Sequence, residues 1–223
     1  MDSNVLFKDN VDKIKQYLKV HPEDINIVVD DITPLMHAVL HERVDVIECL
    51  IEHGCDINFQ NNNGWTSLHY ACFRKDGTRD IIERLISNGA SGLLKDDLGN
   101  TALHYAATSV EDVNIIHQLL IVSDPNSLNN AGMNTFMVSC NIWNKNIRII
   151  SALSNITHDI NLQNIYGLTA IHYCCYFKHY EAIKLLLSFG ADPFIQDNEG
   201  RTPYGLANEE GKRIIDEFLA SRN

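Results

Sequence analysis

Residues 64–71 read GWTSLHYA, and this octapeptide has near copies further along the chain. The copies are GNTALHYA at residues 99–106 and GLTAIHYC at residues 167–174. A motif that recurs in this way is typical of a repeated structural unit, in which every copy occupies an equivalent place in the fold. The octapeptide therefore predicts an array of repeats rather than a single reactive site built around His69.

The interval between copies is nearly constant. Aligning the chain on the third residue of the octapeptide gives Thr33, Thr66, Thr101, Asn134, Thr169 and Thr202. These positions are separated by 33, 35, 33, 35 and 33 residues. The fifth position is always bulky, from Leu35 to Tyr204, and the eighth is always small, from Ala38 to Ala207. This regularity indicates six copies of one packing unit.

Each unit is expected to contain two helices. A second apolar patch with helical spacing follows each motif, as in Ile183, Leu186 and Leu187. Short segments such as HDINLQNIYG separate the units and place Asp, Asn and Gly at fixed offsets. These residues favour turns, because glycine adopts positive φ and Asx side chains bond to nearby backbone. We therefore expect helix pairs joined by projecting, hairpin-like loops.

This unit resembles the ankyrin repeat, a turn followed by two antiparallel helices that opens with TPLHxA. The first motif supplies Thr33-Pro34-Leu35, although Met36 stands in the histidine position. The resemblance covers essentially the whole chain and implies an all-α ankyrin-repeat solenoid of about seven stacked helix-turn-helix units. We expect one domain, 1–223, with an N-terminal capping unit at 1–30, five internal repeats at 31–197 and a C-terminal capping repeat at 198–223.

The resemblance also implies what the repeated polar residues do. In the ankyrin pattern the threonine caps the first helix and the histidine bonds to neighbouring turns, so His69, His104 and His172 are expected to be structural. The motif at residues 132–140 departs from this pattern, because Asn134 replaces the threonine and Met137 replaces the histidine. We expect the poorest hydrogen bonding there. Asp31 replaces the turn glycine of the first motif, which leaves the turn geometry at that point open.

Composition and charge narrow the partner classes. The chain has 45% hydrophobic and 21% charged residues, which is enough apolar material for a folded core. Its net charge of −11 disfavours nucleic acids and anionic membranes, because both attract concentrated lysine and arginine. We therefore expect a protein partner, no nucleic acid and no membrane, with the chain monomeric when unbound.

The cysteines and the N-terminal region favour a reducing compartment. The first twenty residues mix charges into every turn, so we expect no signal peptide. The six cysteines are then expected to be reduced thiols, and the chain is expected in the cytoplasm. The nucleus is an alternative location, and a host cytosol is another if the chain is a pathogen effector.

Two sharper chemical interpretations are weaker. His69 with Cys72, and His172 with Cys175, share helical spacing but lie in distant units, whereas zinc usually binds four convergent ligands. Cys174 occupies the small buried position, where a thiol is unreactive. No nucleophile elbow, phosphate-binding glycine loop or HExxH helix occurs. We expect no enzymatic activity, no cofactor and no metal.

What remains is a binding surface, and the resemblance indicates where it lies. In ankyrin repeats the variable contact positions flank the turn glycine and end the first helix. Here they hold Asn62, Asn63, Trp65, Phe73, Arg74, Asp97, Leu98, Asn100, Asn130, Met133, Ile142, Trp143, Tyr166, Tyr176 and Phe177. Aromatic residues, Met and Arg are enriched at protein interfaces, so we predict partner binding through the concave face and the loop tips. Trp143 either packs internally or anchors a partner.

The tyrosines at 70, 105 and 173 share the seventh position of the octapeptide, and their repetition favours packing between repeats. The function predicted from sequence is a non-enzymatic adaptor, inhibitor or scaffold that binds a protein. One alternative is an assembly chaperone, because the size and unit count are similar to those of gankyrin, which binds a proteasomal ATPase. Another is a pathogen ankyrin effector that regulates a host enzyme.

Overall fold

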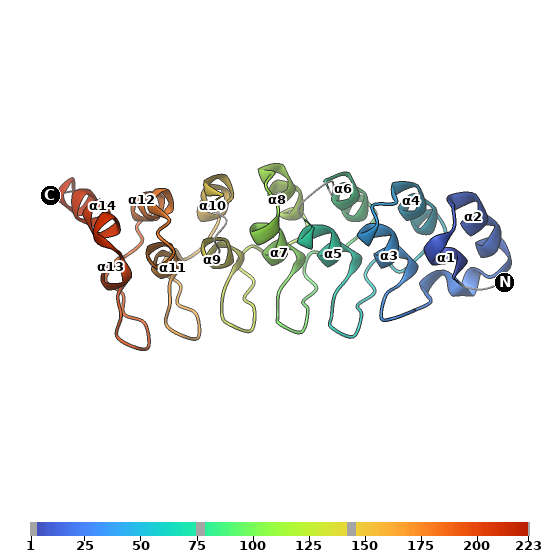
Figure 1. Ribbon diagram of the computed structural model, residues 1–223, viewed down its shortest axis with the longest axis horizontal. Coiled ribbons are helices and arrows are strands. Elements are labelled where there is room, and N and C mark those ends of the chain that lie inside the picture. The colour runs from blue at the N-terminus through green and yellow to red at the C-terminus, as the bar shows by residue number, and fades with distance from the viewer. Residues whose placement is uncertain (1–3, 75–78, 142–145, 223) are drawn as a thin grey trace.

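The computed structural model describes residues 4–74, 79–141 and 146–222. Within these ranges the chain is helical, with an isolated bridge between Val29 and Ile32 and no strand. The helices form seven successive pairs that stand side by side in one elongated row (Figure 1). The first three units are α1 (Val5–Lys8) with α2 (Val11–Val20), α3 (Pro34–Leu40) with α4 (Val44–Glu52), and α5 (Ser67–Phe73) with α6 (Arg79–Ser87).

The remaining units continue the row. They are α7 (Ala102–Ser109) with α8 (Val113–Leu119), α9 (Thr135–Cys140) with α10 (Ile147–Ser154), α11 (Ala170–Tyr176) with α12 (Tyr180–Ser188), and α13 (Pro203–Leu206) with α14 (Glu209–Ala220). A 3-10 turn, η1 (Pro22–Asn26), follows the first unit. The predicted ankyrin-type solenoid is therefore the observed fold.

The core runs along the row as one continuous apolar layer. First helices pack against the first helices of neighbouring units, as α5 does against α3 and α7, and second helices pack against second helices. The small position of each motif allows this close approach, because Ala71, Ala106 and Cys174 are fully buried between helices. Each unit thus buries its apolar side mainly against its neighbours, as in other repeat arrays.

Buried histidines join the units, as the resemblance implies. The backbone N–H of Thr66 donates to Nδ1 of His69 at 3.1 Å, so the ring carries its proton on Nε2. That Nε2 donates to the carbonyl of Asn100 in the next unit at 3.2 Å. His104 and His172 repeat this arrangement with the carbonyls of Met133 and Arg201, at 3.2 Å each.

The fifth unit reaches the same geometry with other groups. The side chain of Asn134 caps α9 by accepting from the N–H of Met137 at 2.9 Å, and its amide donates to Thr157 at 3.2 Å. Met137 is buried in the place of the histidine. The cap is therefore retained, whereas the bond that a histidine makes to the next unit at this position is lost, in line with the expected weakness of this unit.

The loops project to one side of the row and are held by glycine and Asx residues (Figure 1). Gly64 has φ of 76°, and the side chain of Asn61 accepts from the N–H groups of Asn63 and Trp65 at 3.2 and 2.8 Å. In the first motif Asp30 and Asp31 adopt positive φ of 50° and 65°, which closes an equivalent turn without glycine.

At the first junction between loops, the N–H of Asn62 donates to the carboxylate of Asp31 at 2.9 Å. Each later pair of neighbouring loops is joined by one backbone hydrogen bond, a series that we call the loop ladder. Its four bonds are Asp97 N–H to Asn63 O, Asn130 N–H to Leu98 O, Ile165 N–H to Ala131 O and Asn198 N–H to Tyr166 O, at 2.9 to 3.1 Å. The ladder fixes the spacing of the loop tips along the row. The tips and the first helices together form what we call the inner face.

Candidate protein-binding surface

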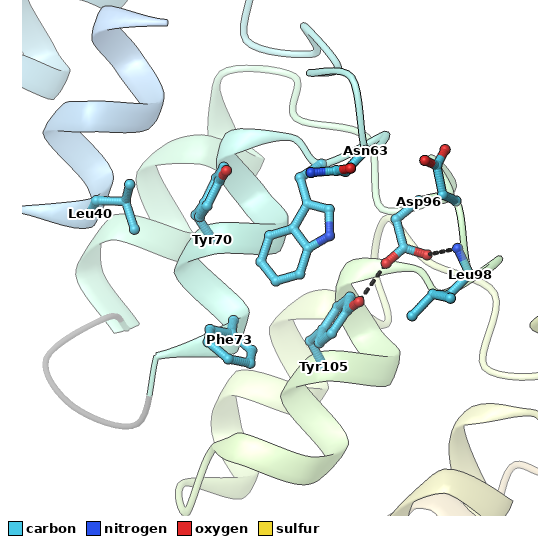
Figure 2. A pocket seen from close by; sticks show the side chains of 9 residues that line it. Leu40, Asn63, Tyr70, Phe73, Asp96, Leu98 and Tyr105 are labelled. Carbon is cyan, nitrogen blue, oxygen red and sulfur yellow. Dashed lines mark hydrogen bonds between the residues drawn. The ribbon is translucent and has the colours of Figure 1, made fainter. Parts of the chain in front are cut away.

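An open pocket of about 530 Å³ lies on the inner face between the third and fourth units. We call it the aromatic pocket, and its lining consists of Leu40, Asn63, Trp65, Tyr70, Phe73, Asp96, Asp97, Leu98 and Tyr105. Figure 2 shows Tyr70, Phe73 and Tyr105 extending from neighbouring helices toward the same space, with Asp96 and Leu98 on the loop beside them. The third and fourth units supply most of the recess, and Leu40 of the second unit completes its lining.

The rings of this pocket touch one another. The centroid of Trp65 lies 4.7 Å from that of Tyr105, 5.0 Å from Tyr70 and 5.5 Å from Phe73. Such distances are typical of packed aromatic pairs, which stabilise each other and hold each ring in one orientation. The cluster is still open to solvent, because Phe73 is 55% exposed. The result is a preformed apolar platform of four rings.

Hydrogen bonds fix two of these rings to their own loops. The hydroxyl of Tyr105 donates to one carboxylate oxygen of Asp96, and the other oxygen accepts from the N–H groups of Leu98 and Asn100 at 3.0 and 2.8 Å (Figure 2). Burial, together with this bond to Asp96, raises the pKa of Tyr105 to about 12. In the same way the hydroxyl of Tyr70 accepts from the amide of Asn61 at 3.1 Å. The tyrosines therefore have the packing role expected of them, and two of them also line the pocket.

A second pocket of about 350 Å³ lies between the sixth and seventh units, and we call it the C-terminal pocket. Its lining consists of Asn141, Leu168, His172, Tyr173, Tyr176, Phe177, Arg201 and Leu206. Tyr176 is 64% exposed and meets Phe177 edge-on at 5.1 Å between ring centroids. Arg201 pairs with Asp197 at 2.8 Å and with Glu199 at 2.9 Å. This pocket therefore contains a cation of its own.

Most residues predicted to contact a partner are accessible on the inner face. Leu98 is 64% exposed and Tyr166 is 59% exposed. Asn62, Asn63, Asp97 and Asn130 are also exposed, and Trp65 and Phe177 are half-buried. The aromatic pocket brings Asn63, Trp65, Phe73, Asp97 and Leu98 together, whereas Tyr176 and Phe177 belong to the C-terminal pocket.

Two predicted contact residues, Arg74 and Asn100, have partners within the chain. Arg74 donates to the carbonyl of Leu40 and pairs with Glu42 at 2.8 Å, which ties it to the preceding unit. The carbonyl of Asn100 accepts from His69, and its side chain accepts from Asn129 at 2.9 Å.

Met133 requires a correction. It is only 6% exposed, because its flexible apolar side chain folds into the core, so it offers no contact surface. Ile142 and Trp143 lie outside the described residues.

Sequence reasoning missed Leu40 and Asp96 and favoured a packing role for Tyr70 and Tyr105. All four line the aromatic pocket. A signal for Asp96 existed, because it occupies the same place in its loop as Asn61, and an acid there gives the neighbouring tyrosine a charged acceptor. Leu40 comes from the preceding unit, so only the fold places it near Trp65.

The described residues were compared with two simple patterns, a cluster of metal-binding side chains and a membrane-spanning helix. Residues 4–74, 79–141 and 146–222 contain no group of three or more metal-binding side chains placed to share an ion. Across the same ranges, no helix combines the length and apolar character needed to span a bilayer. All six cysteines are free, and burial raises the pKa of Cys175 to about 12, so this thiol is protonated at neutral pH.

Comparison with known proteins agrees with the fold. The family described as ankyrin repeats (3 copies) matches residues 5–96, 103–197 and 136–223. The crystal structure of the ankyrin repeat domain of Bcl-3 superposes with a TM-score of 0.82, covering 98% of this chain and 96% of that one at 21% sequence identity. This likeness concerns the fold alone.

Two curated relatives match over shorter stretches. An ankyrin repeat and LEM domain-containing protein 1 homolog from Caenorhabditis elegans is 39% identical over 57 residues, which is 26% of this chain and 8% of that protein. Mouse protein phosphatase 1 regulatory subunit 27 is 32% identical over 88 residues, which is 35% of this chain and 53% of that protein. The matched part is thus less than two thirds of either relative.

Proposed function

This chain belongs to the ankyrin-repeat family, and from that premise we propose that it binds a segment of a protein partner along its inner face. The family makes it a protein-interaction module. The finer proposal is that the aromatic pocket anchors the partner and that the C-terminal pocket provides a second contact. The observation that carries it is the cluster of four mutually packed rings beside exposed Leu98.

Physical reasoning supports this assignment. The rings are held in place by one another and by hydrogen bonds, so a partner would meet groups that lose little freedom on binding. Aromatic side chains in a well-packed recess are the residues that most often dominate binding energy. The loop ladder and buried histidines hold the two pockets on one array of units.

The proposal is tested by capturing partners on the immobilised chain. Wild type is compared with Trp65→Ala/Phe73→Ala and with a control, Leu93→Ala/Ile121→Ala, which removes apolar groups that are 62% and 77% exposed outside the two pockets. We expect the first variant to weaken partner binding by about 30-fold or more, and the control to leave it unchanged. Circular dichroism checks that each variant is folded.

An unchanged partner affinity in folded Trp65→Ala/Phe73→Ala would contradict the proposal. If only Leu93→Ala/Ile121→Ala lost partner affinity, the binding surface would instead lie on the segments that follow α6 and α8. A Tyr176→Ala/Phe177→Ala variant measures the second contact separately.

We also propose that the chain acts in the cytoplasm, since its six free cysteines suit a reducing compartment, and fluorescence microscopy of the tagged chain tests this.

The similarity to a phosphatase regulatory subunit favours one partner class in particular. We propose an enzyme catalytic subunit as the second candidate, with this chain as its regulator. The capture experiment separates the two cases, because a regulated enzyme would change its activity when the purified chain is added and an adaptor's partner would not.

A further inference from the structure

We propose that the aromatic pocket binds one arginine side chain of the partner, with its guanidinium stacked on the ring platform and paired with Asp97. This inference rests on the proposed function and adds the chemistry of the group that is recognised. It draws on the arrangement of the rings, the state of the two carboxylates and the contrast with the C-terminal pocket.

The rings allow binding on their outer faces only. Centroids 4.7 to 5.5 Å apart around Trp65 leave no gap in which a cation could be enclosed between two rings. A ligand must therefore lie flat against the platform, from the solvent side. A guanidinium group is planar and weakly hydrated, so it stacks on an aromatic face more readily than the compact, strongly hydrated ammonium of lysine.

The two carboxylates of the pocket differ in their availability. Asp96 is buried, and its oxygens accept from Tyr105, Leu98 and Asn100. Asp97 is exposed, and no described residue forms a hydrogen bond or ion pair with its carboxylate. Its backbone is fixed by bonds to Asn63 at 3.0 Å and from Asn130 at 2.8 Å. Asp97 thus presents an unused carboxylate at a defined place beside the rings.

The described cations nearest in sequence to the pocket are engaged elsewhere. Arg74 is bonded to Leu40 and Glu42, and Lys95 donates to the carbonyl of Leu128 at 2.7 Å. The lining itself contains two acids and no lysine or arginine. With a net charge of −11 on the whole chain, the local field attracts a cation from outside.

The C-terminal pocket already has an arginine of this chain in its lining. Arg201 lines it together with Tyr173, Tyr176 and Phe177, and its guanidinium pairs with Asp197 and Glu199. The aromatic pocket has the rings and the acids but lacks the arginine. We therefore expect a foreign arginine in the aromatic pocket and none in the C-terminal pocket.

The test uses small probes on the intact chain. Nα-acetyl-arginine amide, the isosteric uncharged citrulline amide and Nα-acetyl-lysine amide are titrated separately, while NMR follows the indole N–H of Trp65 and the amide N–H of Leu98. We expect the arginine probe to shift both signals and to bind about 5-fold more tightly than the citrulline probe. The lysine probe should lie between them. Asp97→Asn, which leaves the rings intact, should reduce the preference for arginine over citrulline to the part that stacking on the rings supplies.

Four results would overturn the inference: no saturable shift with the arginine probe, equal affinity for citrulline, equal or tighter binding of lysine, or an unchanged preference in Asp97→Asn. The two proposals fail in different ways. If the probes fail while Trp65→Ala/Phe73→Ala still loses its partner, the binding surface stands and the arginine assignment falls. If the arginine probe binds but that variant keeps its partner, the pocket is a cation site outside the partner interface.

Discussion

The third unit and the fifth unit have the same pair of helices but carry different residues at the capping, histidine and aromatic positions of the octapeptide. The third unit has Trp65, Thr66, His69 and Tyr70, whereas the fifth has Met133, Asn134, Met137 and Val138 at the same places. In the third unit His69 bonds to the next unit, and Trp65 and Tyr70 belong to the exposed ring platform. The residues of the fifth unit provide a helix cap and apolar filling.

The octapeptide usually serves two purposes together, forming the helix pair and supplying the histidine and aromatic groups, and the fifth unit separates them. The cap and the apolar layer are enough to form the helix pair, because α9 and α10 keep the regular arrangement. The histidine and the aromatic residues add a side-chain bond to the next unit and an exposed ring platform. A unit can therefore lack both and still keep its place in the row.

The largest effect on stability should come from replacing a histidine that bonds one unit to the next. His104→Leu removes the bonds to Thr101 and Met133. The buried N–H and hydroxyl of Thr101 lose their acceptor, whereas the carbonyl of Met133 keeps its bond from the N–H of Asn129. We expect a loss of about 4 kcal/mol in the free energy of unfolding. Met137→Leu is the matched change in the fifth unit, and it should cost about 1 kcal/mol because no hydrogen bond is lost. Urea unfolding followed by circular dichroism measures both, and equal losses would show that the histidine bonds are not the source of the difference.

The next largest effect should come from replacing the turn glycines, and its size should differ between the loops of the third and fifth units. An added Cβ at Gly64 would lie 2.7 Å from the Cα of Asp96, whereas at Gly132 the nearest atom would be 3.2 Å away. Both glycines have positive φ, so alanine brings backbone strain at either position, but only Gly64→Ala forces two loops apart. We expect losses of about 3 kcal/mol for Gly64→Ala and about 1.5 kcal/mol for Gly132→Ala. The same unfolding measurements apply, and a larger loss at Gly132 would reverse the comparison.

The smallest effect is a dependence on pH. Burial lowers the pKa of His104 from 6.5 to about 4 in the folded chain, so between these values the unfolded chain binds a proton that the folded chain does not. The free energy of unfolding therefore decreases as pH falls through this window, by about 1.5 kcal/mol between pH 6.5 and 5 for this histidine. Burial lowers the pKa of His69 and His172 in the same direction.

Unfolding curves at several pH values test this dependence. The slope of stability against pH should be shallower in His104→Leu than in wild type, because one titrating group is removed. Met137→Leu should retain the wild-type slope, because methionine does not titrate. Parallel slopes in wild type and His104→Leu would place the acid sensitivity elsewhere.

The fold could be predicted from sequence because the repeated spacing reports packing that recurs between neighbouring units. The candidate surface could be predicted in part. Positions beside the turn glycines gave Trp65 and Leu98, because loop tips face solvent in every unit. The position equivalent to Trp65 in the fifth unit gave Met133, which is buried, because a flexible thioether fills a core gap that a rigid indole does not.

Other parts of the surface depend on contacts between distant residues. Arg74 bonds to the carbonyl of Leu40, 34 residues earlier in the chain, and no local pattern indicates how far its side chain reaches. The hydrogen bond from Tyr105 to Asp96, both of which line the pocket, likewise forms only when the loop is folded. Local pattern thus indicates which positions face outward, and the stacked units determine what those positions touch.

The loop ladder has a consequence for how such a protein changes length. Every junction in it uses the same backbone donor and acceptor, including the junction from Ala131 to Ile165 in the fifth unit, where the histidine bond is missing. Because these groups belong to the main chain, this hydrogen bond does not require particular side chains at the two positions. A gene segment encoding one unit can be duplicated or excised, and the rejoined neighbours will find complementary edges already in place.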